Sequence, residues 1–106
     1  MNPVIAGIGA YVPTRKMHND ELAHLVDTSD EWIYSRTGIR TRHIAADDEA
    51  ASDLATEAGK RAIEQAGIEP QQLDLILVAT STPDYPGLPS TAAIVQDKLG
   101  AVNAGA

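Results

Sequence analysis

Residues 73–79 (LDLILVA) restrict the fold of this chain more than any other stretch. They are apolar at almost every position, a pattern typical of a β-strand that is covered on both faces. A second apolar run, residues 4–12, ends at Pro13 and predicts another buried strand. Strands covered on both faces occur where helices pack on each side of a sheet, so we expect an α/β layered fold.

Helical patterns lie between and after these two runs. Small and apolar residues recur at helical spacing from Ser52 to Ala66, where Gly67 ends the pattern. Ser90 is a predicted N-cap for a further helix, which Gly100 ends. The small residues of the first helix predict close packing against a sheet, and the element order predicts a right-handed crossover between the two long strands.

The region between residues 13 and 50 is expected to hold shorter elements. Asn19 is a predicted N-cap for a short helix, with Leu22, Leu25 and Val26 facing the interior. Residues 39–44 alternate enough in polarity to form a strand or an extended edge.

Gly7 and Gly9 interrupt the first apolar run. A dinucleotide-binding turn requires a third glycine and a following helix, whereas Pro13 stands where that helix would open. We therefore expect the two glycines to let another backbone or a helix approach closely.

Composition and length exclude several classes of protein. The chain has no cysteine, so it holds no disulfide, thiolate metal site or cysteine nucleophile within its 106 residues. Its net charge of −7 argues against a general nucleic-acid surface. It shows no membrane-length apolar run and no signal-peptide pattern, which favours a cytoplasmic location. His18 and His24 are six apart and do not share a helical face, so no metal site is expected there.

The length fits one domain at most, and its last residues predict an incomplete one. Residues 101–106 carry no turn signal and no closing element. Two buried strands make a poor sheet, since three or more with cover are usually needed. We expect a larger domain whose remaining strands come from residues beyond Ala106 or from a second polypeptide.

Residues 27–42 (DTSDEWIYSRTGIRTR) predict a short helix with distinctive ends. Thr28 and Glu31 have the spacing of a capping box, and acidic residues in the first turn suit the helix dipole. Gly38 fits the left-handed position that ends a helix.

Trp32 and Arg36 lie four residues apart within this helix and therefore on one face. One interpretation is a structural cation–π pair. The other is a site for a flat ligand that bears phosphate, with the indole stacked on a base and the guanidinium paired to a phosphate. On residue types alone the structural interpretation is favoured.

The tract resembles, without a gap over residues 27–40, the N-terminal segment of β-ketoacyl-[acyl-carrier-protein] synthase III, the initiating condensing enzyme of type II fatty acid synthesis. The likeness covers essentially the whole chain, including residues 7–13 (GIGAYVP), 37–40 (TGIR), 42–44 (RHI), 62–68 (AIEQAGI), 75–80 and 88–90 (LPS). The resemblance implies a thiolase-like αβαβα sandwich, of which residues 1–106 would form the first part of the N-terminal half.

The resemblance also implies an acyltransferase that works as a cytoplasmic homodimer. Such an enzyme condenses an acyl-CoA primer, expected to be acetyl-CoA, with malonyl-acyl carrier protein to start fatty acid elongation. It uses a cysteine, a histidine and an asparagine; neither His43 nor Asn103 matches those positions, so the 106 residues alone are expected to be inactive. The resemblance implies no cofactor, because acyl-CoA is a substrate. It also implies no metal, no nucleic acid and no membrane partner.

Four residues of this sequence match positions that bind ligand in that family. Trp32 and Arg36 would hold the adenine and the nucleotide portion of coenzyme A, with Thr28 beside them. Leu88 matches a loop position that reaches across the dimer into the partner's acyl pocket. These roles come from the resemblance and not from the spacing of the residues.

Two alternatives remain open. The chain could belong to a related starter enzyme of polyketide or hydroxymethylglutaryl-CoA type. It could also be a non-catalytic module that only binds coenzyme A or only supports dimer assembly.

Overall fold

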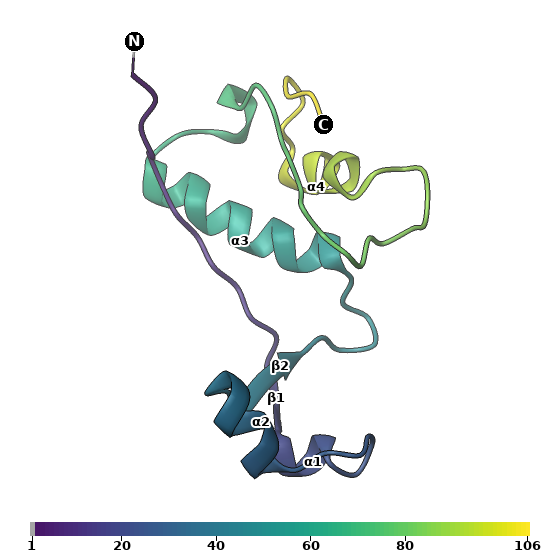
Figure 1. Cartoon of the computed structure of the whole chain (residues 1–106). Coiled ribbons are helices and arrows are strands. Elements are labelled where there is room, and N and C mark those ends of the chain that lie inside the picture. Colours follow the sequence, from purple (N-terminus) through teal and green to yellow (C-terminus); the bar gives the residue numbers. More distant parts are fainter. Residues whose placement is uncertain (1) are drawn as a thin grey trace. The chain divides into compact units, whose positions relative to one another are not determined.

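In the computed structural model, which describes residues 2–106, the chain divides into two units (Figure 1). Residues up to Tyr11 together with Glu49–Ala106 form the first unit, and Val12–Asp48 form the second. The first unit contains α3 (Ala51–Ala66), a 3-10 helix η1 (Pro70–Gln72) and α4 (Thr91–Leu99). The second contains β1 (Arg15–His18), α1 (Asn19–Leu22), α2 (Asp30–Thr37) and β2 (Thr41–Ile44).

Helices α3 and α4 pack on each other and end where the sequence predicts. Gly67 and Gly100 take left-handed conformations after them, with φ of 68° and 72°. Ser90 is the N-cap of α4, since its Oγ accepts from the Ala93 amide at 3.1 Å. The two helices are close at Gly59, where a Cβ would lie in ordinary van der Waals contact, 3.4 Å from a methyl carbon of Leu99.

An extended segment lies across the small-residue face of α3 (Figure 1). A Cβ on Gly7 would lie 2.4 Å from the carbonyl oxygen of Ala62, and one on Gly9 would lie 2.2 Å from that of Ala58. The side chain of Gln65 accepts from the amide of Ile8 on the same segment, at 2.6 Å. The expected close approach at both glycines is therefore confirmed.

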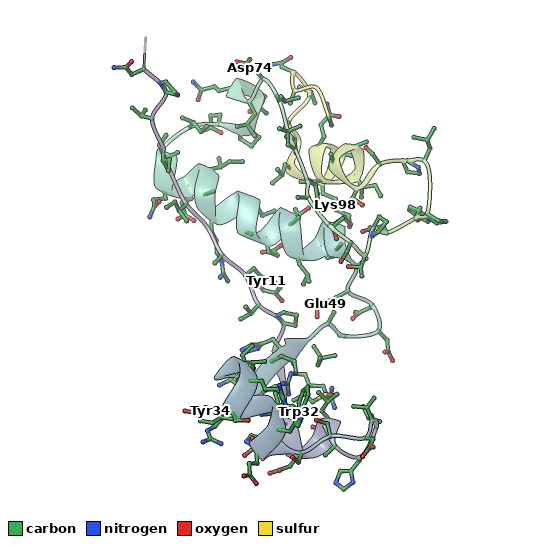
Figure 2. The ribbon with its side chains drawn as sticks, in the orientation of Figure 1. Tyr11, Trp32, Tyr34, Glu49, Asp74 and Lys98 are labelled. Carbon is green, nitrogen blue, oxygen red and sulfur yellow. The ribbon has the colours of Figure 1, made fainter. Side chains whose placement is uncertain are left out.

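Tyr11 ends this segment beside Glu49 (Figure 2). Its hydroxyl donates to a carboxylate oxygen of Glu49 at 3.0 Å, and the guanidinium of Arg61 lies 5.4 Å from the ring centroid. The hydrogen bond to Glu49 raises the pKa of the Tyr11 hydroxyl, because the carboxylate favours the protonated phenol.

The prediction of two buried strands at residues 4–12 and 73–79 is wrong for this structure. Both runs are extended, but neither is a strand, and Val4 and Leu77 are each 84% exposed. A single parallel bridge joins Leu75 to Gly105. A strand needs a neighbour for its backbone groups, and these two runs do not pair with each other, so the predicted crossover joins no sheet. The mixture of helices and strands still fits part of an α/β fold.

The second unit is organised by a short antiparallel pair in which Arg15 faces Ile44 and His18 faces Thr41. The sequence predicted β2 but not β1. Asn19 is the first residue of α1 rather than its N-cap, because Nδ1 of His18 accepts the Asp20 amide at 3.1 Å.

Two side chains after α1 also differ from expectation. Leu25 is 68% and Val26 54% exposed, so neither faces an interior within the described residues. Between residues 2 and 106, no helix has the length and apolarity that a membrane span requires.

Asp53, in the first turn of α3, is expected to make the stability of the first unit depend on pH. Its carboxylate accepts from the Ala50 amide at 2.8 Å and from Nζ of Lys98 at 2.6 Å. The hydrogen bond from the Ala50 amide first, and then that from Lys98, lower the pKa of the Asp53 carboxyl below its ordinary value. The stabilisation that these hydrogen bonds give the folded state is therefore present above the pKa of Asp53 in the unfolded chain. It is lost as pH falls through the lower pKa of Asp53 in the folded state.

The prediction is tested by urea denaturation of the wild type and Asp53→Asn between neutral pH and about pH 2. The difference in unfolding free energy is expected to be largest near neutrality and to shrink in acid. A difference of constant size over that range would contradict the assignment.

Candidate functional site

Helix α2 carries the predicted site, and its own sequence fixes its ends. Ser29, not Thr28, is the N-cap, because Oγ of Ser29 accepts the amide of Trp32 at 3.1 Å. The predicted capping box of Thr28 and Glu31 is therefore wrong by one residue. Gly38 ends the helix with φ of 70°, as predicted.

Trp32 and Arg36 project together from α2. The Cζ atom of Arg36 lies 4.7 Å from the centroid of the indole, and the indole is 55% exposed. Ile33, the next residue, is buried and anchors the helix in its unit. The structural cation–π pair is thus present, and the indole also remains accessible at the surface.

An open groove of about 660 Å³ runs beside this indole. Thr28 lies in it, and its hydroxyl oxygen is buried without a hydrogen-bond partner. A buried hydroxyl without a partner is uncommon and costs free energy unless a further group satisfies it. The groove is lined by apolar and hydroxyl side chains of one unit: Leu22, Val26, Asp27, Thr28, Ser29, Trp32 and Ile33.

The groove offers a flat aromatic surface, a nearby cation and an unsatisfied hydroxyl. Arg36 makes no ion pair among the residues that the structure describes, so its charge is not neutralised by a carboxylate. An indole stacks on planar rings, and a guanidinium suits phosphate oxygens. The arrangement therefore suits a ligand with a base and a phosphate.

A second group of side chains holds α2 in place. Oδ2 of Asp30, at the start of α2, accepts from Arg40 at 3.0 Å. Arg40 also lies over Tyr34, with its Cζ 3.7 Å from the ring centroid. Tyr34 and Trp32 leave α2 on different sides (Figure 2).

Asn19 is the centre of this group and is fully buried. Its Nδ2 donates to Asp30 at 2.8 Å and to the carbonyl of Ile39 at 2.7 Å, and its Oδ1 accepts from Arg42 at 2.5 Å. No local sequence pattern indicates this role, because the three partners are 11 to 23 residues away.

Leu88, the remaining predicted site residue, lies in the first unit. It is 91% exposed, on the segment between residues 80 and 90 that precedes α4. Within residues 2–106, no cluster of three histidine, aspartate or glutamate side chains could hold a metal ion.

The chain is similar to curated β-ketoacyl-[acyl-carrier-protein] synthases III, whereas no family model matches it. It is 59% identical over 96 residues to the Sulfurovum sp. protein, a match that covers 91% of this chain and 28% of that protein. The crystal structure of 3-oxoacyl-[acyl-carrier-protein] synthase III from Aquifex aeolicus matches with a TM-score of 0.84 at 47% identity, over 92% of this chain and 31% of that one.

The priming β-ketosynthase of the R1128 polyketide biosynthetic pathway also matches, with a TM-score of 0.84 at 42% identity. That match covers 95% of this chain and 30% of the ketosynthase. The chain spans about a third or less of each of these relatives, and the region it matches is their N-terminal portion.

Proposed function

We propose that this chain is part of an acyltransferase that starts fatty acid elongation, because it resembles the N-terminal portion of β-ketoacyl-[acyl-carrier-protein] synthase III. The enzyme would condense an acyl-CoA primer, with acetyl-CoA as the expected primer, with malonyl-acyl carrier protein. The identity of 59% over 96 residues supports this class of reaction. The same resemblance supports a cytoplasmic homodimer as the working form.

Within that enzyme, the groove beside α2 would receive the nucleotide end of coenzyme A. The observation that carries this proposal is the exposed indole of Trp32 with the Arg36 guanidinium 4.7 Å from its centroid. The indole would stack on the adenine, Arg36 would pair with a phosphate, and the unsatisfied hydroxyl of Thr28 would gain a polar partner. The cysteine, histidine and asparagine of the condensation would come from outside these 106 residues.

Trp32→Ala in the full-length enzyme is expected to raise the KM for acetyl-CoA roughly tenfold, because base stacking contributes about 1–3 kcal/mol. The KM for malonyl-acyl carrier protein should change much less. Steady-state kinetics with each substrate varied in turn measure both values.

Leu25→Ala is the control, since it removes another exposed apolar side chain of the same unit that does not line the groove. Its KM for acetyl-CoA should stay near that of the wild type. An unchanged KM for acetyl-CoA in Trp32→Ala would refute the assignment of the groove.

A starter condensing enzyme of a polyketide pathway is the second candidate. The 42% identity to the R1128 priming β-ketosynthase favours it. Assays of the full-length protein with fatty acid and polyketide acyl carrier proteins separate the two. A protein that binds acyl-CoA but forms no condensation product with either carrier would instead support a non-catalytic module.

A further inference from the structure

The segment from Thr80 to Ser90 is exposed at every position except Asp84. The amide of Asp84 donates to Oγ1 of Thr91 at 3.3 Å, which closes residues 84–91 into a loop at the start of α4. This loop contains Leu88 and two prolines, which fix φ at two positions and reduce the freedom of the chain between its ends.

The carboxylate of Asp84 fastens this closed loop to the beginning of α3. Its Oδ1 accepts from the amide of Ser52 at 2.9 Å, and its Oδ2 accepts from the hydroxyl of Ser52 at 2.5 Å. Lys98 of α4 donates to the same hydroxyl oxygen at 2.9 Å. Ser52 is fully buried, so these hydrogen bonds are shielded from competing water.

The start of α3 lacks a cap of its own, and Asp84 supplies one. Ala50 occupies the N-cap position and has no side-chain oxygen, which leaves the first amides of the helix in need of acceptors. A carboxylate also suits the positive end of the helix dipole. Asp84 therefore has a defined position relative to a rigid element, although its neighbours in the loop are exposed.

We infer that Asp84 is a positioning residue that holds Leu88 where it selects the length of the acyl primer. This inference rests on the proposed function and on the resemblance, which implies that Leu88 reaches an acyl pocket. Three residues separate Asp84 from Leu88, and one of them is Pro86, so displacement of Asp84 moves Leu88. Ser52 and Thr91 bond Asp84 directly, and Lys98 acts through the hydroxyl of Ser52.

The test compares acetyl-CoA with hexanoyl-CoA as primers for the full-length enzyme. Asp84→Asn keeps the size of the side chain but has one oxygen in place of two, so either the amide or the hydroxyl of Ser52 loses its acceptor. We expect the ratio of kcat/KM for the two primers to change by about three- to tenfold in Asp84→Asn. Leu88→Ala should change this ratio less in the Asp84→Asn background than in the wild type.

Asp97→Asn, which removes the same charge from an exposed position of α4, is the control and should leave the ratio unchanged. Hydrogen exchange provides a readout without substrate. The amides of Ser52 and Asp84, which are hydrogen-bonded in the wild type, should exchange faster in Asp84→Asn, while those in the middle of α3 keep their protection.

The outcomes are distinguishable. Equal losses on both primers, or fully additive effects of Asp84→Asn and Leu88→Ala, would overturn the positioning role and leave the proposed function intact. A wild-type enzyme that uses no acyl-CoA would overturn both. Unchanged exchange at Ser52 and Asp84 would show that Asp84 does not hold the loop on α3, whatever the activity.

Discussion

Gly9→Ala is expected to destabilise the first unit by about 3 kcal/mol, at the upper end of the usual cost of overpacking. The new Cβ would lie 2.2 Å from the carbonyl oxygen of Ala58 and 2.5 Å from the amide nitrogen of Ala62. Both are backbone atoms of α3, which cannot rotate away as a flexible side chain could. The extended segment would therefore have to leave the helix.

The backbone entropy of the unfolded state acts in the opposite direction but is smaller. Replacing glycine by alanine stabilises a protein by about 0.4–1 kcal/mol where the folded conformation allows it. The steric cost at Gly9 exceeds this gain several-fold. The segment would also lose its hydrogen bond from Arg61 to the carbonyl of Ala10, which is 2.6 Å long.

Gly87→Ala is the matched control, because a Cβ at Gly87 meets no atom within 4 Å and its φ is not positive. It should be neutral or slightly stabilising. Urea denaturation followed by helical circular dichroism measures both variants. A Gly9→Ala protein as stable as Gly87→Ala would show that the segment does not lie against α3 in solution.

The helices of the first unit could be predicted from sequence because their signals are local. Gly67, Ser90 and Gly100 act within a few residues of the backbone groups that they satisfy. The two long strands were predicted wrongly for the opposite reason. Residues 73–79 have the composition of a covered strand, but a strand forms only beside a partner, and composition does not supply one.

In the candidate site, too, the local pairing could be predicted from sequence and the contacts between distant residues could not. The pairing of Trp32 with Arg36 follows from their spacing on one helix, and the structure places them as predicted. The choice of N-cap was wrong because Thr28 and Ser29 are both good caps, and the register of the helix decides between them. Asn19 was assigned to a local capping role, whereas its side chain bonds residues far along the chain.

Asn19→Asp is expected to destabilise the second unit by about 2–3 kcal/mol, the upper part of the range for hydrogen bonds that involve charged groups. The substitution preserves shape but replaces the donating Nδ2 by an oxygen. That oxygen would face the carboxylate of Asp30 at about the present 2.8 Å and the carbonyl of Ile39 at about 2.7 Å. The remaining contact with Arg42 compensates only in part, since Asn19 is fully buried.

The single tryptophan of the 106 residues lies in this unit, so its fluorescence follows the unfolding of the unit in urea. Asn103→Asp makes the same chemical change at an exposed asparagine that donates one hydrogen bond, to the carbonyl of Gln71. It should cost less than about 1.5 kcal/mol. Equal stability losses in the two variants would mean that Asn19 does not join α1, α2 and β2. A specific loss in Asn19→Asp, with an accompanying rise in the KM for acetyl-CoA, would link this buried amide to the placement of Trp32.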